Sequence, residues 1–566
     1  MRSLSANGAP RKTGRESPRN ALVPHDIDDA AARAVRTLTG RAPGLDHRAM
    51  RICFALLSLS FLALVSSSTL AGCGPESSGS GGGATTTTTG TTSSGSGGTT
   101  STGGTGGSGA QAGSTTTGGG GAGGVTTTST TSTTDTGGSG PACGAIARRL
   151  GGSSAADTIT TSAVAVTSDG GAILAGEFGG TAAIGPQTLS SAGGQDAFVV
   201  RLSPGGGVAW AKRFGANYDD RVKGVAPLAD GGAVIVGTFD GVVDFGGKTL
   251  TSIGGPDAFV VRLDAAGGLV LALQIENADA RGVAIAEGGD LLVAGDFSAA
   301  TKIAGVPVSP DGADDLFVVR LSEQGTLVSL RHVAFEVKPG VIAIASSAGR
   351  TYVAGSFQGT TDLGTGPLVS AGAKDAFLAR LDDALTTVFA RRYGDDSSQE
   401  ARGVAVLSDG SAALVGSFKS ALDFDGTILT ADTLDDAFVA RVDDAGAVVF
   451  AKRFGDAQAQ IARGVAVTAT DEILVAGGFQ GAIDPGDGAI TAADGEDVFL
   501  TRLDASGAAI QTLGWGATLD QRARSVAVDP CGAVVLGGDF NGALTFGADA
   551  LTAGGTADGF VARLAP

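Results

Sequence analysis

Histidine, cysteine and aromatic residues are scarce in this chain of 566 residues. It has 3 His, 4 Cys and 2 Trp, and aromatic residues make up 5%. After residue 73 the only imidazole is His332 and the only thiols are Cys143 and Cys531. Such sparse and distant ligands argue against a transition-metal cluster with the usual spacing. Nucleophile elbows and phosphate loops are also missing from any strand-to-helix setting. We therefore predict no cofactor, no metal and no catalytic residue.

Basic residues are in deficit over most of the chain. The chain has 39 basic and 57 acidic side chains, of which 10 basic and 5 acidic ones lie in residues 1–72. The rest of the chain therefore has 29 basic and 52 acidic side chains, a net charge of −23. A charge of that sign repels phosphates and anionic lipid surfaces. The sequence thus argues against a nucleic-acid partner.

Residues 50–72 have the features of an export signal. Met50 and Arg51 give a positive start, and a short apolar run over 52–65 leads to Leu70-Ala71-Gly72-Cys73. The run is shorter than a membrane span. The tetrapeptide resembles the lipobox of bacterial lipoproteins, which implies cleavage before Cys73 and lipid attachment to its sulfur. Gly74 after the cysteine implies the outer membrane by the same resemblance. The alternative is an uncleaved signal anchor.

Two segments flank this signal. Residues 1–49 form an Arg-rich extension that is unusual before a signal peptide, and we expect translation to start at Met50. Residues 73–142 are almost wholly Gly, Thr and Ser. Such a composition buries too little apolar surface to offset the entropy of ordering. We expect a disordered stalk between the lipid anchor and a folded domain over residues 143–566.

The folded domain repeats one motif seven times. Asp-x-Phe-(Val/Leu)-x-Arg-(Leu/Val) recurs every 58–61 residues, and an apolar run that ends in Gly-x-Phe keeps the same period. Repetition at such a period indicates a solenoid or a propeller. The motif aspartates are Asp196, Asp257, Asp315, Asp375, Asp436, Asp497 and Asp558.

Each period holds four short apolar runs separated by turn signals. In the fifth period they are residues 403–406, 412–418, 437–442 and 447–453, with no amphipathic helical pattern between them. Four antiparallel strands in a radially repeated unit make a propeller blade. The sequence therefore predicts an all-β fold, a seven-bladed β-propeller of four-stranded antiparallel blades.

The ends of the domain predict how the ring closes. The last copy of the motif, from Asp558 to Pro566, ends after a third strand. Residues 144–151 match fourth strands such as residues 446–455. We predict that Ala145–Leu150 completes the last blade, which removes the open seam. Cys143 and Cys531 then lie at the same edge of that blade, and we predict a disulfide between them. The alternative is two unpaired thiols.

The repeat resembles the bacterial β-propeller repeat family abbreviated SBBP. The resemblance rests on Asp-Ala-Phe-Val-x-Arg-Leu-Asp-x-x-Gly at residues 257–267 and Val-Ala-Gly-x-Phe at 353–357, and it covers about 420 residues. It implies the propeller fold and frequent export, and it brings no catalytic motif. Sialidase-type Asp boxes are absent, and Trp210 and Trp515 alone cannot build the Trp-rich blades of quinoprotein propellers.

The charged motif residues have structural interpretations. Residues at equivalent positions of seven blades are spread around a ring and cannot converge on one site. We therefore expect the aspartates to cap the turn before the third strand. The arginines five residues later are expected to join neighbouring blades; they are Arg201, Arg262, Arg320, Arg380, Arg441, Arg502 and Arg563. His332 is expected to be a surface or packed imidazole.

A second basic set is the candidate binding site. Its members stand at the start of first strands, which line the channel, and are expected to ring one mouth of it; they are Lys223, Arg281, Arg402, Arg463 and Arg524. Such a ring would attract a small anion or a carboxylate. The alternative, which we favour, is pairing with nearby acids: Asp219, Asp220, Asp395, Asp396 and Glu400. Long connections such as 240–256 are expected on the same face, where binding usually occurs.

The sequence favours a monomeric, surface-displayed binding or scaffold propeller without catalytic activity. Its expected partners are the membrane, through the lipid anchor, and a surface glycan or protein. Two alternatives stay open: a carbohydrate-active lyase or hydrolase, and a structural spacer of the cell envelope. A paired-carboxylate cleft with a Tyr or Lys near the channel mouth would favour the enzyme, and Tyr218 is the tyrosine nearest that face.

The lipobox makes a direct prediction. Cys73→Ser should abolish incorporation of a labelled fatty acid and release the protein from the membrane fraction, because the acyl chains supply the attachment. Cys53→Ser, within the signal, is the matched control and should keep the label. Equal labelling of Cys73→Ser and wild type would show that the chain is anchored in another way.

Overall fold

The computed structural model describes residues 144–340 and 342–565, in which every named element is a β-strand, joined by turns and loops. The expected extension, signal peptide and stalk, together with Cys73 and Cys143, lie outside the described residues. No helix in the described part is long and apolar enough to be a candidate membrane span. The strands make six four-stranded antiparallel sheets and one six-stranded sheet, in which the hairpin β22–β23 (Thr360–Thr361, Leu368–Val369) extends the four strands of the third blade. This confirms the predicted seven-bladed propeller of four-stranded blades.

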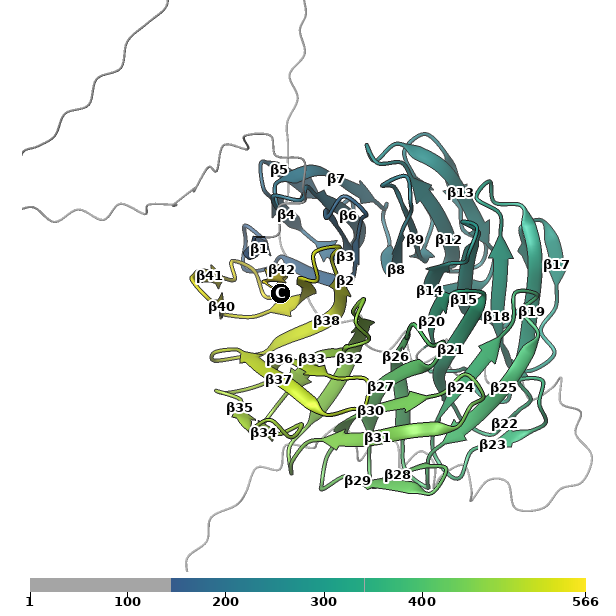
Figure 1. The fold of residues 1–566 in the computed structure, drawn as a ribbon. Coiled ribbons are helices and arrows are strands. Elements are labelled where there is room, and N and C mark those ends of the chain that lie inside the picture. Colours follow the sequence, from purple (N-terminus) through teal and green to yellow (C-terminus); the bar gives the residue numbers. More distant parts are fainter. Residues whose placement is uncertain (1–143, 341, 566) are drawn as a thin grey trace, which may run out of the picture. The chain divides into compact units, whose positions relative to one another are not determined.

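The first strand of each blade lines the centre of the ring (Figure 1). Each contacts the first strands of the two neighbouring blades, and β2 contacts β38, so the ring is closed. The first strands are β2 (Thr158–Val166), β8 (Arg221–Pro227), β14 (Ala278–Ile285), β20 (Ile342–Ser347), β26 (Gln399–Val406), β32 (Gln460–Val467) and β38 (Gln521–Val528).

The second and third strands form the core. Their side chains are buried on both faces of almost every strand, because a neighbouring blade covers each side of the sheet. The second strands are β3 (Ala172–Gly179), β9 (Ala233–Phe239), β15 (Leu291–Phe297), β21 (Arg350–Phe357), β27 (Ala412–Phe418), β33 (Ile473–Phe479) and β39 (Val534–Phe540). The third strands are β6 (Asp196–Leu202), β12 (Asp257–Leu263), β18 (Asp314–Leu321), β24 (Asp375–Leu381), β30 (Asp436–Val442), β36 (Asp497–Leu503) and β42 (Asp558–Leu564).

The fourth strands lie on the outside of the ring. They are β7 (Val208–Phe214), β13 (Leu269–Ile275), β19 (Leu327–Phe335), β25 (Thr387–Tyr393), β31 (Val448–Phe454), β37 (Ala509–Trp515) and, in the last blade, β1 (Ile146–Leu150). β1 pairs antiparallel with β42, Ile146 opposite Arg563 and Leu150 opposite Gly559. The prediction that the N-terminal segment completes the last blade is confirmed.

The long second-to-third connections contain a two-stranded hairpin in every blade, which the sequence analysis missed. The hairpins are β4–β5 (Thr181–Ile184, Gln187–Ser190), β10–β11 (Val242–Asp244, Thr249–Thr251), β16–β17 (Thr301–Ile303, Val306–Val308), β22–β23 (Thr360–Thr361, Leu368–Val369), β28–β29 (Ala421–Phe424, Thr427–Thr430), β34–β35 (Ala482–Ile483, Ile490–Thr491) and β40–β41 (Ala543–Phe546, Asp549–Thr552). They lie at the periphery (Figure 1). Phe245 and Leu422 are buried members of the core. Much of each connection is therefore structural.

Six of the seven motif arginines join neighbouring blades, as predicted, while Arg502 pairs with Glu472 of its own blade at 2.6 Å. Arg201 donates to the carbonyl oxygen of Ala265 in the next blade (3.1 Å), and Arg380 does the same to Asp444 (3.0 Å). The ring seam uses this contact too, since Arg563 donates to the Pro204 carbonyl of the first blade. Hydrogen bonds from a charged donor are stronger than neutral ones. One contact thus serves several interfaces, the seam included.

The motif aspartates are buried turn caps, as predicted. Asp196 accepts the amide of Ala192 (2.9 Å), and Asp257 accepts that of Ile253 (3.0 Å), four residues before it in each case. Burial raises the pKa of Asp436 to about 6, although Arg453, 3.1 Å away, lowers it. The aspartates are fixed by their own turns and do not form a shared site.

The strand pairing places the two segments of the predicted disulfide at one edge. Ile146 of β1 and Val535 of β39 both pair with Arg563 of β42, from opposite sides. Because both strands are antiparallel to β42, they run parallel to each other, two strand spacings or about 10 Å apart. Cys143 precedes Ile146 by three residues, and Cys531 precedes Val535 by four. A disulfide requires a Cα–Cα distance of about 4.4–6.8 Å, so the two turns must converge.

The disulfide stays a prediction, because Cys143 lies outside the described residues. Peptide mapping without reductant should recover a fragment that links Cys143 to Cys531. Cys531→Ser should lower the free energy of unfolding by up to about 5 kcal/mol, because the bond closes a very long loop. Alkylation of both thiols in the unreduced native protein would contradict the prediction.

Candidate functional site

A β-bulge lies in the first strand of six blades. In β8, for example, Val222 pairs with Gly237 and Gly224 with Val236, which leaves Lys223 as the extra residue. A bulge breaks the alternation of a strand and redirects the side chain of the extra residue. The six residues at this position are Ser162, Lys223, Arg281, Arg402, Arg463 and Arg524. All five residues of the predicted basic set are therefore bulge residues.

The bulge also explains the glycine of the Gly-x-Phe motif. A β-carbon on Gly237 would lie 1.9 Å from the carbonyl oxygen of Arg221, two residues before the bulge residue. Gly416 meets the carbonyl of Glu400 at the same distance. No side chain fits at these glycines of the bulged blades. Blade 4 has the motif glycine too, as Gly355 opposite β20, where the described residues show no bulge.

Blade 3 and its neighbours hold a chain of five alternating charges at the mouth. Lys223 Nζ lies 2.5 Å from Asp279 Oδ1, and Arg281 lies 3.1 Å from Asp279 Oδ2 and 2.5 Å from Asp296 Oδ1. Lys338 Nζ contacts Asp296 Oδ2 at 2.7 Å. Asp279 and Asp296 are directly opposite each other on β14 and β15. Three cations and two carboxylates give this chain one net positive charge.

Blades 6 and 7 hold a second network. Glu496 accepts from Arg463 (2.6 Å) and from Arg522, and Arg522 also contacts Asp520 at 2.8 Å. Asp539 pairs with Arg524. Burial lowers the pKa of Arg463 against the opposing effect of Glu496, and the positive charges of Arg524 and Arg402 lower it further. Arg402 and Arg524 are therefore each close enough to repel Arg463.

A buried carboxyl group adjoins this network. Glu177 occupies the middle position of the Gly-x-Phe motif in blade 1, and Ser162 Oγ donates to its carboxylate at 2.9 Å. Burial raises the pKa of Glu177, although Ser162 and the nearby Arg524 and Arg221 lower it. The charges of blades 2 and 7 and a hydroxyl group of blade 1 thus act on one carboxyl group.

The structure places the five basic residues at the bulges of first strands and gives most of them other partners than predicted. Each pairs with an acid, as the favoured alternative proposed, yet Glu400, bound to Arg402, is the one expected acid among the partners. Asp219 pairs with Arg221, Asp220 accepts backbone amides, and Asp395 caps a turn. Those partner assignments were wrong because four of the five basic groups reach acids on strands, and Arg463 reaches Glu496 just before β36.

An elongated cleft opens beside the first network. One part, of about 410 Å³, is lined by Arg221, Lys223, Asn277 and Lys338, with Asp279 and Asp296 at its wall. A second part of about 440 Å³ shares Arg221, Thr238 and Pro256 and adds Tyr218 and Asp240. The Tyr218 side of the cleft is accessible, since that residue is 58% exposed. The cleft therefore combines cationic groups, carboxylates and one exposed aromatic ring.

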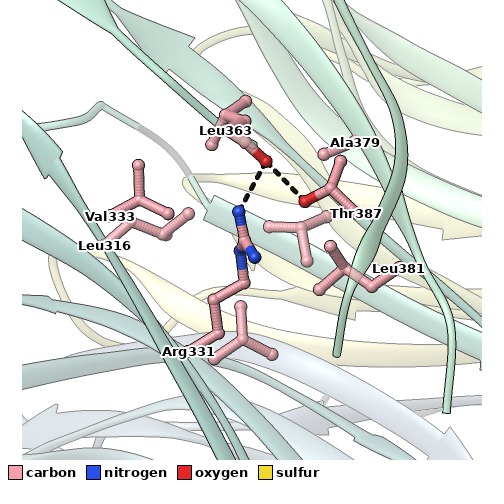
Figure 2. A pocket seen from close by; sticks show the side chains of 9 residues that line it. Leu316, Arg331, Val333, Leu363, Ala379, Leu381 and Thr387 are labelled. Atoms are coloured by element: carbon pink, nitrogen blue, oxygen red, sulfur yellow. Dashed lines mark hydrogen bonds between the residues drawn. The ribbon is translucent and has the colours of Figure 1, made fainter. Parts of the chain in front are cut away.

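A smaller hollow between blades 3 and 4 is a gap in the packing of the two blades around a partly buried arginine. Figure 2 shows Arg331 among Leu316, Val333 and Leu381, with its guanidinium bound to the carbonyl oxygen of Leu363 at 2.7 Å. Burial lowers the pKa of Arg331, although Asp362 opposes this effect. At about 10 Å³ the hollow has no room for a ligand larger than water.

Comparison with known proteins gives distant structural likenesses. No family model matches the chain. No curated protein matches it either. The WD40 domain of Pan2 from Neurospora crassa is 11% identical with a TM-score of 0.39, over 72% of this chain and 89% of that one. An ulvan lyase of a new polysaccharide lyase family is 10% identical with a TM-score of 0.39, over 69% and 93%. At these TM-scores the likenesses carry no argument, and the fold rests on the strand pairing.

Asp220 gives a pH-dependent prediction next to the cleft. It is buried and accepts the amides of Ala216 (2.9 Å) and Asp240 (3.0 Å), while the equivalent residues of blades 5–7 are Gln399, Gln460 and Gln521. Burial raises its pKa to about 6; the two amides lower it, and Asp196 raises it further. The folded state therefore holds this proton more tightly than the unfolded chain, and stability is lost as the pH rises from about 4 to 6.

Asp220→Gln removes this loss. The free energy of unfolding should rise by on the order of 2 kcal/mol at pH 8 and change little at pH 4, as measured by denaturant unfolding. Asp219→Asn is the exposed neighbouring control and should show no such pH dependence. An equal effect of Asp220→Gln at both pH values would refute the linkage.

Proposed function

We propose that the chain is a binding propeller whose ligand, an acidic glycan, occupies the cleft beside Lys223 and Lys338. The observation that carries this proposal is the bulge, which directs a cationic side chain to the rim of an open polar cleft. Lys223, Lys338 and Arg221 would bind the carboxylates of the glycan. Asp240 would accept its hydroxyl groups, and the exposed ring of Tyr218 would pack against a sugar face.

Fixed charges support binding without catalysis. Asp279 and Asp296 each contact two cationic groups, which leaves neither carboxylate poised beside a bond to be cleaved. Such a preorganised set of charges suits recognition, because little reorganisation is needed when a charged ligand arrives.

A carbohydrate-active enzyme is the second candidate. Asp279 and Asp296 form a carboxylate pair, and Lys223, Lys338 and Tyr218 stand at the same cleft, the combination that would favour a lyase or hydrolase. Turnover of a glycan would decide for this candidate. Neither binding nor turnover would favour the structural spacer of the cell envelope.

The wider proposal concerns location and family. We infer an exported lipoprotein of the outer membrane, attached through Cys73 and displayed at the cell surface as a monomer. The lipobox-like Leu70-Ala71-Gly72-Cys73 and the Gly/Thr/Ser-rich residues that follow support this. The seven repeat motifs support membership in the bacterial β-propeller repeat family.

Glycan binding should depend on the lysines at the cleft. On an array of acidic and neutral oligosaccharides, the full-length protein should bind acidic members without cleaving them. Lys223→Met and Lys338→Met should each weaken binding at least tenfold, because a charged hydrogen bond to the ligand is lost. Lys248→Met is the matched control, since Lys248 is exposed on the peripheral hairpin of blade 2. Equal losses for all three variants would place the ligand elsewhere.

A further inference from the structure

One position of the fourth strand lies opposite the phenylalanine of the Asp-x-Phe motif in every blade. In six blades its side chain contacts the buried motif aspartate, which needs a counterpart for its charge, and in blade 6 the position is a glycine. The seven residues at this position, from the first blade to the last, are Arg213, Gln274, His332, Arg392, Arg453, Gly514 and Arg149.

Four blades use arginine at this position. The guanidinium forms an ion pair with the motif aspartate, as between Arg453 and Asp436 at 3.1 Å. Arg213, Arg392 and Arg149 pair with Asp196, Asp375 and Asp558 in the same way. These blades therefore neutralise the buried carboxylate with a permanent positive charge.

Blade 3 replaces the guanidinium by an imidazole and adds a second carboxylate. His332 Nδ1 lies 2.9 Å from Asp315 Oδ2 and 3.8 Å from Asp311 Oδ2. One ligand atom of each of the three residues lies within 4.8 Å of the others. Asp311 stands four residues before the motif aspartate, where blades 1 and 4 have Ala192 and Ala371. Two negative charges thus face a group that carries no permanent positive charge.

The three side chains are held in place from different directions. Asp315 is fully buried and accepts the amides of Asp311 and Gly312, each at 3.0 Å. The ring of His332 packs edge-on against Phe297 with centroids 6.0 Å apart. The side chain of Asp311 is 75% exposed, so an ion can enter from solvent. The group is ordered on its inner side and open on its outer side.

We propose that Asp311, Asp315 and His332 bind a divalent transition-metal ion, for which Zn²⁺ is the probe. One imidazole nitrogen and two carboxylate oxygens are donors that Zn²⁺ accepts, with solvent at the open position. Tetrahedral bonds of about 2.1 Å would put donor atoms about 3.4 Å apart, between the two separations found here. The ion supplies the positive charge that arginine supplies in blades 1, 4, 5 and 7.

This proposal departs from the sequence-based prediction of no metal, which counted histidines and cysteines and required several of them. One histidine is enough where Asp311 of the preceding turn and Asp315 at the start of β18 complete the set. The ion would pin the connection before β18 to the outer strand β19, at a place independent of the channel-mouth cleft.

The test is Zn²⁺ binding by the full-length, tag-free protein after treatment with chelator and dialysis. Calorimetry should show a site that the wild type has and His332→Arg lacks, with affinity lowered at least tenfold in Asp311→Asn. His332→Arg installs the residue of four other blades and should fold, as thermal melting checks. Co²⁺ bound at the site should give visible d–d absorption that is likewise absent from His332→Arg.

Blade 5 offers a matched gain of function. It carries Asp432 and Asp436 with Arg453, so Arg453→His reproduces the arrangement of blade 3. This variant should bind one more Zn²⁺ than the wild type. Equal Zn²⁺ binding by wild type and His332→Arg, or no binding by the wild type at millimolar Zn²⁺, would overturn the proposal.

Discussion

The close approach of two backbones on the inner strands underlies both the fold and the candidate site. An extra residue in the first strand pushes a carbonyl oxygen onto the second strand, where only glycine fits, as Gly237 does against Arg221. The same bulge redirects Lys223 and its equivalents in five other blades. Six blades thus share a backbone irregularity, and the side chain at that position is Ser, Lys or Arg.

The architecture can be predicted from the sequence because it depends on motifs that occur seven times in the chain. Strand number, blade number and closure by Ala145–Leu150 are read from period, apolar runs and the truncated last copy, and the pairing of Ile146 with Arg563 agrees with them. The motif Arg201 and Asp196 have the predicted structural roles for the same reason. An interaction that recurs in the blades requires the same residue type in each repeat, and this recurrence can be seen in the sequence.

The candidate site is predicted less completely because its contacts differ between blades. Strict alternation does not reveal a bulge, so the sequence locates Lys223 near the mouth but does not identify Asp279 as its partner. The peripheral hairpins were missed because their short strands lie among turn-forming residues. The buried Phe245 is an apolar residue that could have indicated one of them. The sequence alone does not show which residues of other blades correspond to His332. Its pairing opposite Phe317 shows that it is equivalent to Arg213 and Arg453.

Closure by the N-terminal strand has a mechanical consequence. Tension applied through the N-terminal segment reaches the ring at β1, which is held by its backbone pairing to β42 and by the ion pair of Arg149 with buried Asp558. Without the predicted Cys143–Cys531 disulfide, β1 would be the first strand to bear the load, and its detachment would uncover the edge of β42. With the disulfide, the load would pass from Cys143 to the turn between β38 and β39, so the bond would protect β1 from tension.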